Sequence, residues 1–425
     1  MIIQNVDVFT PDFHFCRGSI VLKEDRIERV ILDGDPMAGS PAEAQGTEQV
    51  IDGSGCYAIP GLIDIHFHGC MGADFCDGTQ DAIRTLAEYE VRNGVTAICP
   101  ATLTLPVSQL CHVLSEAAAY ARRQQEGLES GADLVGVNME GPFISHVKKG
   151  AQNEDYIIPC DADICEQFIR AGGGLLKIIG LAPEENPEYL SYIEAVRDRV
   201  KVSLAHTNAD YDTAMAAFEA GASHAVHLFN AMPEFTHREP GVVGAVCDRA
   251  HVTAELICDG NHVHPSVVRG AFAMIGDERI VLISDSLRAC GLGDGLIDLG
   301  GQQVQVTGTR ATLVDGGNLA GSVTNLMDCM RICVQEMGIP LESAVRCATI
   351  NPARVIGEEM NRGSLMSGKI ADIVLLGRDD LQVKTGNIGL EPFMYPVLYT
   401  NTEEELKERI KVVNKNINIL SRNNY

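Results

Sequence analysis

PGLIDIHFHG, residues 60–69, is a short apolar run that carries two histidine residues near its end. The run itself, LIDIHFH (62–68), has the apolar and β-branched composition of a buried strand. Because His66 and His68 are two positions apart, their side chains face the same side of that strand. We therefore expect both imidazoles to project together from the end of a buried strand.

Seven further runs of this kind follow, and segments of helical periodicity separate most of them. Continuous apolar runs that alternate with helices are typical of parallel strands buried on both faces. Eight such units over roughly 220 residues predict an α/β fold, a (β/α)8 TIM-like barrel. A doubly wound sheet is the alternative, but no GxGxxG motif follows the first run. The runs are VTAICPAT (95–102), DLVGVNME (133–140), LLKIIGLA (175–182), KVSLAHT (201–207), SHAVHLF (223–229), VTAELICD (252–259) and RIVLISDS (279–286), and the helical segments are 80–92, 107–125, 161–171, 187–199, 209–220 and 265–275.

The sequence on either side of the barrel predicts a second, smaller unit. Residues 1–60 contain short β-rich pieces, and residues 359–400 return to β character with GSLMSGKIADIVLLG at 363–377. We expect these two segments to form a small β-sandwich, with the barrel between them at 61–358. Smaller features are a β-hairpin insertion near 301–320, two helices near 323–337 and 341–348, and a polar helical tail at 401–425.

The composition narrows the class of partner. The chain has 425 residues with 33 basic and 58 acidic side chains, a formal net charge of −25. This acidity argues against binding nucleic acid or an anionic membrane surface, and no apolar run approaches the ~20 residues of a membrane span. The N-terminus lacks a basic segment and an apolar signal core, and the fourteen cysteines include no CxxC pair. We expect a cytoplasmic protein with reduced thiols.

Ionisable residues close most of the predicted strands. Since barrel active sites are built at the carboxyl ends of the strands, these residues are expected to converge on one point. A single histidine is more often a core or surface residue, and that reading suffices for His14, His112 and His251, but it does not explain the whole set. The set is His66, His68, Glu140, His206, His227 and Asp285.

Four imidazoles and two carboxylates are a donor set that suits Zn²⁺, Fe²⁺ or a similar divalent ion. A bound divalent metal lowers the pKa of its water to about 7 and polarises a carbonyl group. Asp285, next to that water, would take up the proton and pass it to a leaving amine. Metal-bound hydroxide with an acid/base of this kind hydrolyses amides. A serine nucleophile is not expected, because the chain contains no GxSxG motif.

Several motifs carry a resemblance to a known family. PGLIDIHFHG with this order of candidate ligands resembles the amidohydrolase superfamily, and the chain resembles more closely its family of N-acetylglucosamine-6-phosphate deacetylases, over about residues 50–375. That resemblance implies hydrolysis of the acetamide of an amino-sugar phosphate. The motifs are MEGPFISHVKKGAQN (139–153), AHTNA (205–209), HLFNAMPEFTHREPGVVGA (227–245), DGNHVHP (259–265), SDSLRACGLGDG (284–295), LAGS (319–322) and NPARVIG (351–357).

The resemblance also implies roles for individual residues. Glu140, His206 and His227 would hold the main metal, and His66 with His68 would hold a second one bridged by Glu140. One or two divalent ions per subunit are implied, with Zn²⁺ preferred and Fe²⁺, Mn²⁺ or Co²⁺ as alternatives. Asp285 would be the catalytic acid/base.

For the substrate, the resemblance implies that Asn230 and Ala231 contact the sugar phosphate and that His262 binds substrate. Arg238 would reach the phosphate in the neighbouring subunit, which implies a homodimer. Gln152 stands where some members have a histidine that contacts the acetyl group, and an amide can donate a hydrogen bond but cannot become cationic. The matching substrate loops also contain Ala151, Asp259, Gly260, Asn261, Leu319, Ala320 and Gly321.

Other functions remain as alternatives. The substrate is either the glucosamine derivative or a related one, such as its galactosamine epimer. Dihydroorotase-like and hydantoinase-like enzymes bridge two metals with a modified lysine at the end of the fourth strand, but Lys177 lies near the start of that run, well over about 10 Å from its end. A deaminase does not need Glu140 as a ligand. A non-catalytic scaffold on this barrel would be expected to lose some of the six positions, and all six are intact.

Overall fold

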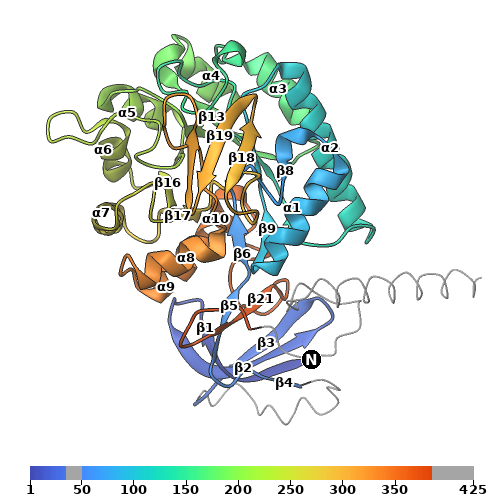
Figure 1. Cartoon of the computed structure of the whole chain (residues 1–425). Helices are drawn as coiled ribbons and strands as arrows, with labels where there is room; N and C mark the ends of the chain where they lie inside the picture. Colours follow the sequence, from blue (N-terminus) through green and yellow to red (C-terminus); the bar gives the residue numbers. More distant parts are fainter. Residues whose placement is uncertain (35–49, 385–425) are drawn as a thin grey trace, which may run out of the picture. The chain divides into compact units, whose positions relative to one another are not determined.

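The computed structural model describes residues 1–34 and 50–384. It divides into two compact units, Met1–Gly61 together with Ser364–Tyr425, and Leu62–Gly363. Each unit has its own sheet structure (Figure 1). The expected remainder of the C-terminal β segment, 385–400, and the expected tail, 401–425, lie outside the described residues.

The smaller unit is built from both ends of the chain. Its strands form one six-stranded mixed sheet in the described residues, in the order β21-β5-β1-β2-β3, with β4 paired to β1. A single sheet results because β1 pairs along one edge with β2 and along the other with both β4 and β5. The strands are β1 (Ile2–Phe9), β2 (Phe15–Lys23), β3 (Arg26–Leu32), β4 (Val50–Asp52), β5 (Cys56–Pro60) and β21 (Ile373–Gly377).

The larger unit contains the eight expected strands in their expected order. They form two parallel ladders, β10-β12-β13-β14-β15-β16-β17 and β11-β9-β6, because the second and third runs each divide into two short strands. Hydrogen bonds from Asp285 N to His66 O (2.9 Å) and from His68 N to Ser286 O (2.7 Å) join the ends of the first and eighth runs. The predicted TIM-like barrel is therefore confirmed. The strands are β6 (Leu62–Asp64), β9 (Val95–Ile98), β10 (Ala101–Thr102), β11 (Asp133–Leu134), β12 (Val137–Met139), β13 (Leu176–Leu181), β14 (Lys201–Leu204), β15 (His224–Ala225), β16 (Thr253–Ile257) and β17 (Ile280–Ile283).

Helices surround the barrel sheet (Figure 1). Eight of them lie at predicted helical segments, including the two expected near 323–337 and 341–348. Side-chain oxygens of Thr79, Asp161 and Asp210 cap three of these helices. The pattern did not reveal α6, a short Gly- and Val-rich helix that begins after Pro240. The helices are α1 (Gln80–Arg92), α2 (Val107–Gln125), α3 (Ala162–Ala171), α4 (Tyr189–Val196), α5 (Tyr211–Ala220), α6 (Gly241–Asp248), α7 (Pro265–Ile275), α8 (Leu326–Gln335), α9 (Leu341–Ala348) and α10 (Ile350–Ile356).

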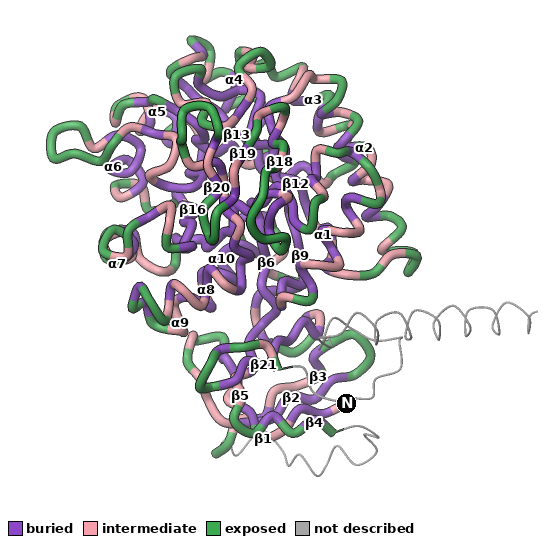
Figure 2. Tube along the Cα trace, viewed as in Figure 1, coloured by how far each residue is buried: buried purple, intermediate pink, exposed green. Residues whose placement is uncertain are grey.

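The insertion near 301–320 is wider than the expected hairpin. It is a three-stranded antiparallel sheet of β18 (Gly295–Leu299), β19 (Gln302–Thr307) and β20 (Arg310–Leu313), drawn in orange in Figure 1. β18 escaped detection because most of its residues are exposed (Figure 2) and so leave no buried pattern in the sequence. The inner side of the sheet packs on Leu103 and Leu287, two residues beyond Asp285. The sheet thus covers part of the carboxyl end of the barrel. A small two-stranded antiparallel sheet, made of β7 (Gly69–Cys70) and β8 (Ala73–Asp74), follows the first run of the barrel.

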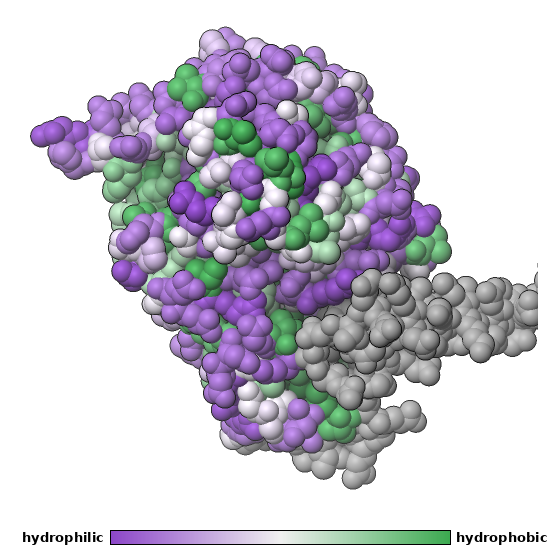
Figure 3. Space-filling model, viewed as in Figure 1, coloured by the Kyte–Doolittle hydropathy of each residue, from purple (hydrophilic) through white to green (hydrophobic). Residues whose placement is uncertain are grey.

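The surface carries no large apolar face in the view of Figure 3, where apolar side chains occur as small separate groups among hydrophilic ones. In the part of the chain that the structure describes, no helix combines the length and the apolar character needed to cross a membrane.

Candidate active site

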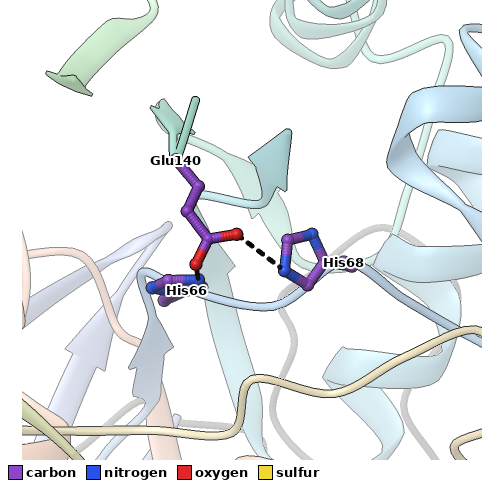
Figure 4. Close-up of side chains that lie close together, drawn as sticks. All are labelled: His66, His68 and Glu140. Atoms are coloured by element: carbon purple, nitrogen blue, oxygen red, sulfur yellow. Dashed lines mark ion pairs between the residues drawn. The ribbon is translucent and has the colours of Figure 1, made fainter. Parts of the chain in front are cut away.

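Glu140 is the centre of the candidate site. It follows β12 at the carboxyl end of the barrel and is buried. Its Oε1 lies 2.8 Å from His206 Nε2, 2.9 Å from His227 Nε2 and 3.4 Å from His66 Nε2. Its Oε2 lies 3.4 Å from His68 Nε2, and Figure 4 shows this carboxylate between His66 and His68. Four imidazoles that are far apart in sequence thus face one carboxylate.

These side chains form two donor sets that share Glu140. His66, His68 and Glu140 make one, and Glu140, His206 and His227 make the other, with the ligand atoms of each set within 4.8 Å of one another. Asp285 adjoins the first set, since its Oδ1 lies 3.4 Å from His68 Nε2. All six side chains that the sequence singled out therefore lie together.

In three of the imidazoles, the nitrogen that does not face Glu140, Nδ1, lies within hydrogen-bond distance of an acceptor oxygen. Backbone carbonyls and carboxylates only accept hydrogen bonds, so each Nδ1 next to one carries a proton, and an ion bound beside Glu140 would take the Nε2 lone pairs. The Nε2 of His66 is buried yet has no hydrogen-bond partner in the described residues. Such a nitrogen lone pair is what a divalent ion requires, so the donor set fits a metal. The partners are Glu255 Oε2 at 2.8 Å for His66, Lys148 O at 2.9 Å for His206 and Asn230 O at 3.1 Å for His227.

The electrostatics of the site favour a cation. Burial alone would lower the pKa of His68, but its contacts with Asp285 and Glu140 outweigh burial and raise that pKa to about 10. Burial would raise the pKa of Glu140, yet His206 and His227 hold it well below its usual value. Burial has the same opposing effect at Asp285, whose pKa His68 and His66 lower. Protons and divalent ions compete for the same imidazole nitrogens in a site of this kind.

The backbone at the strand ends is strained. His206, His227 and Asp285 have φ angles of +42°, +25° and +49°, a region that side chains with a Cβ rarely adopt. Such strain is retained where the surrounding structure enforces it, and it concentrates at functional sites. Gly180 has a related role, because a Cβ there would lie 2.2 Å from the carbonyl oxygen of Glu140.

Gln152 touches the centre directly. Its Nε2 lies 2.5 Å from Glu140 Oε2, and its Oε1 accepts a hydrogen bond from the backbone N–H of Thr104 at 2.7 Å. The amide therefore donates to Glu140 Oε2, the carboxylate oxygen that also lies 3.4 Å from His68 Nε2. Neighbouring Ala151 accepts a hydrogen bond from Gln302 in β19.

The loop after β16 forms a second polar group near Asp285. His262 Nδ1 lies 2.8 Å from Asp259 Oδ2, while the backbone N–H groups of Asn261 and His262 donate to Asp259 Oδ1. Burial would lower the pKa of His262, but Asp259 outweighs burial and raises it. The side chain of Asn261 donates to Thr309 O in the insertion, and Gly260 takes a φ of +80° in the turn.

Two other predicted segments lie next to the ligands. Ala231 has a φ of +50° and accepts a hydrogen bond from Thr207 N, and Asn230 provides the carbonyl that holds His227. Leu319 forms a bridge to β20, and Ala320 donates to Ala311 O. At Gly321, where φ is +59°, a Cβ would lie 3.0 Å from Asp285 O, so only glycine fits there.

Arg238 lies on an exposed loop, apart from these groups. It lines a cavity of about 490 Å³ together with acidic and aromatic side chains. The other residues that line it are Asn208, Asp210, Tyr211, Asp212, Pro233, Glu239, Pro240 and Gly241.

Three polar residues that support the ligands are not among the residues predicted from the sequence. Glu255 lies inside β16 and contacts His66, and His224 in β15 contacts Glu255 at 3.0 Å. A glutamate within the apolar run VTAELICD was the signal that could have identified the first. Asp64 is a third supporting residue, since it accepts hydrogen bonds from His66 N and Ser284 Oγ and burial raises its pKa to about 7.

A metal-dependent hydrolase is the class of protein that the barrel, the two donor sets and the adjoining carboxylate define. The comparison with known families agrees with this class. The model of the amidohydrolase family matches residues 57–419, and the chain belongs to this family.

The names of the chain's relatives describe a narrower activity than the family name does. The chain is 36% identical to the N-acetylglucosamine-6-phosphate deacetylase of Bacillus subtilis, over 91% of this chain and 96% of that protein. It is 34% identical to the N-acetylgalactosamine-6-phosphate deacetylase of Escherichia coli O157:H7, over 81% of this chain and 89% of that protein. The solved N-acetyl-D-glucosamine-6-phosphate deacetylase of Mycobacterium smegmatis superposes with a TM-score of 0.81 at 30% identity, covering 90% of this chain and 96% of the other.

Proposed function

We propose that this protein hydrolyses the acetamide of N-acetylglucosamine 6-phosphate to give glucosamine 6-phosphate and acetate. The observation that carries the proposal is Glu140 Oε1, which three imidazole Nε2 atoms face within 3.4 Å, with Asp285 adjoining. The substrate follows from the relatives, which are deacetylases of this sugar phosphate and cover most of the chain.

The metal would be held by the two donor sets that share Glu140, as one or two divalent ions per subunit. Zn²⁺ suits a set of imidazoles and one carboxylate, with Fe²⁺, Mn²⁺ or Co²⁺ as alternatives. A bound divalent ion would lower the pKa of water and polarise the amide carbonyl.

Asp285 is the residue that moves protons in this proposal. Its pKa is held low by His68 and His66 against the effect of burial, so the carboxylate is ionised at neutral pH and can act as a base. Asp285 Oδ1 takes a proton from the attacking water and then delivers it to the amide nitrogen as the C–N bond breaks. The strained backbone at Asp285 and the close approach of Gly321 keep this carboxylate in place.

The loops around the centre would bind the sugar phosphate. We assign the phosphate to Arg238 of a neighbouring subunit and the sugar to the segments with Asn230 and His262, so the active form is a homodimer. The hydrogen bond to Asp259 keeps His262 oriented. All fourteen cysteines are unpaired in the structure, which supports a cytoplasmic location.

A second candidate is the galactosamine epimer of the substrate, because one relative of similar identity is a deacetylase of that sugar phosphate. A cyclic-amide hydrolase is less consistent with the site. Lys177 is the second residue of β13 and so lies near the amino end of that strand, whereas Glu140 lies at the carboxyl end of the barrel.

The test is acetate release from purified protein reconstituted with Zn²⁺, Fe²⁺, Mn²⁺ or Co²⁺. The substrates are the two epimeric N-acetylhexosamine 6-phosphates and unphosphorylated N-acetylglucosamine. We expect turnover of the glucosamine 6-phosphate derivative well above that of the other two. Preference for the epimer would select the second candidate, and a metal-loaded protein inactive on all three would contradict the proposal.

We expect Arg238→Ala to raise KM roughly 10- to 100-fold with little change in kcat, because a hydrogen bond to a charged group contributes about 1.5–3 kcal/mol. Arg249→Ala, which removes an arginine paired with Glu219 elsewhere on the surface, is the control. Mixed dimers of Arg238→Ala and Asp285→Asn chains decide whether the arginine crosses the interface. A site with normal KM forms in the mixed dimer only if Arg238 acts on the neighbouring subunit.

A further inference from the structure

Glu255 is a buried carboxylate inside β16 that belongs to neither donor set. It is fully buried, and its neighbours along the strand, Ala254 and Leu256, are apolar core residues. Its Oε2 lies 2.8 Å from His66 Nδ1, and its Oε1 lies 3.0 Å from His224 Nε2. An unpaired charge in such a position would be strongly destabilising, so these two contacts account for its presence.

The same residue also supports the main donor set, which consists of Glu140, His206 and His227. Glu255 Oε2 accepts a hydrogen bond from the backbone N–H of His227 at 3.1 Å. The carbonyl of Glu255 accepts another from Leu228 N at 2.9 Å. His227 has a φ of +25°, so its strained backbone is held from β16 at the point where the ligand leaves the strand.

His224 completes the arrangement from the other side. Its Nδ1 lies 2.7 Å from Thr253 Oγ1, and its Nε2 faces Glu255, so its ring is fixed at both ends. His224 is fully buried. It therefore anchors Glu255 while contacting neither Glu140 nor the other donor nitrogens in any hydrogen bond or ion pair that the structure describes.

We propose that Glu255 is a positioning residue that couples the two halves of the metal centre. A carboxylate only accepts hydrogen bonds, so it keeps the proton of His66 on Nδ1 and presents the Nε2 lone pair to the metal. Through the His227 N–H it holds the main ligand set as well. This inference rests on the proposed metal site, and its test uses metal binding alone, without substrate.

Glu255→Gln is expected to weaken zinc binding roughly 10- to 100-fold, the usual cost of losing a partner behind a metal ligand. The glutamine amide can donate to His66 Nδ1, which moves the imidazole proton to Nε2 and blocks coordination. The measurement is competition for Zn²⁺ between the metal-stripped full chain and a chromogenic chelator, with metal content counted after dialysis. Glu90→Gln is the matched control, because Glu90 is a fully buried glutamate of α1 outside the site.

A double-mutant cycle with His66→Asn shows whether Glu255 acts through that ligand. If it does, Glu255→Gln will cost clearly less in the His66→Asn protein than in the wild type, with the remainder due to the His227 contact. His224→Asn provides a second test that leaves Glu255 in place, and it should weaken zinc binding by a smaller factor.

Unchanged zinc affinity in Glu255→Gln or in His224→Asn would overturn the inference, as would full additivity in the cycle. An equal loss of zinc affinity in Glu90→Gln would also overturn it, because the effect would then follow from changing any buried carboxylate and not from the contacts of Glu255. Failure of the proposed function is separate: a wild-type chain that binds zinc tightly but releases no acetate contradicts the substrate assignment and leaves the role of Glu255 intact.

Discussion

Asp285→Asn is expected to lower kcat by about 10³-fold or more while the protein keeps its metal, because a general acid/base contributes roughly 10²- to 10⁴-fold and the amide cannot shuttle a proton. Asparagine has nearly the shape of aspartate, so the backbone hydrogen bonds of residue 285 to His66 O and from Ser322 N should persist. Steady-state acetate release together with metal content checks both halves of the prediction.

The control is Asp277→Asn, which removes a carboxylate paired with Arg346 at 2.9 Å, away from the ligands. It should leave turnover near the wild-type level. Near wild-type turnover in Asp285→Asn would refute the proton-transfer role. Loss of the metal in that variant would instead make Asp285 a ligand, since its Oδ1 already lies 3.4 Å from His68 Nε2.

His206→Asn is expected to abolish metal binding and to cost about 10³-fold or more in kcat, because an active-site metal provides several kcal/mol of transition-state stabilisation. His66→Asn is expected to cost less and to retain one ion per subunit. The geometry supports this order. His206 Nε2 lies 2.8 Å from Glu140 Oε1 and 3.2 Å from His227 Nε2, whereas His66 Nε2 lies 3.4 Å from the carboxylate.

Metal content after dialysis, measured beside kcat, separates the two variants, and His112→Asn on the exposed face of α2 is the control. If His66→Asn removed all bound metal, the pair His66 and His68 would be the primary site. The order of the two donor sets would then be reversed.

The barrel could be predicted because its signal is local. Each buried parallel strand needs an apolar run, such as LIDIHFH or KVSLAHT, and each following helix shows its own periodicity. Strand β18 and helix α6 were missed for the converse reason. β18 is mostly exposed, and α6 is short and rich in glycine and valine, so neither carries a strong pattern.

The candidate centre was predictable in part. Strand ends meet at one end of a parallel barrel, so six residues at run ends had to approach one another, and the structure brings them together. How the remaining polar atoms pair is not a property of position along a strand. That Gln152 holds Glu140, and that Glu255 holds both His66 and His227, depends on side-chain directions set by the whole barrel.

The sequence by itself therefore determined the architecture and the composition of the donor set, since both follow from short-range patterns and from the geometry of parallel strands. Only the tertiary structure decided which nitrogen of each histidine faces Glu140. It also decided that Glu140 belongs to the donor sets, whereas Glu255 supports the histidines. Hydrogen bonds such as that between His66 and Glu255 join residues 189 positions apart. Their formation depends on distances of a few ångströms that no local pattern encodes.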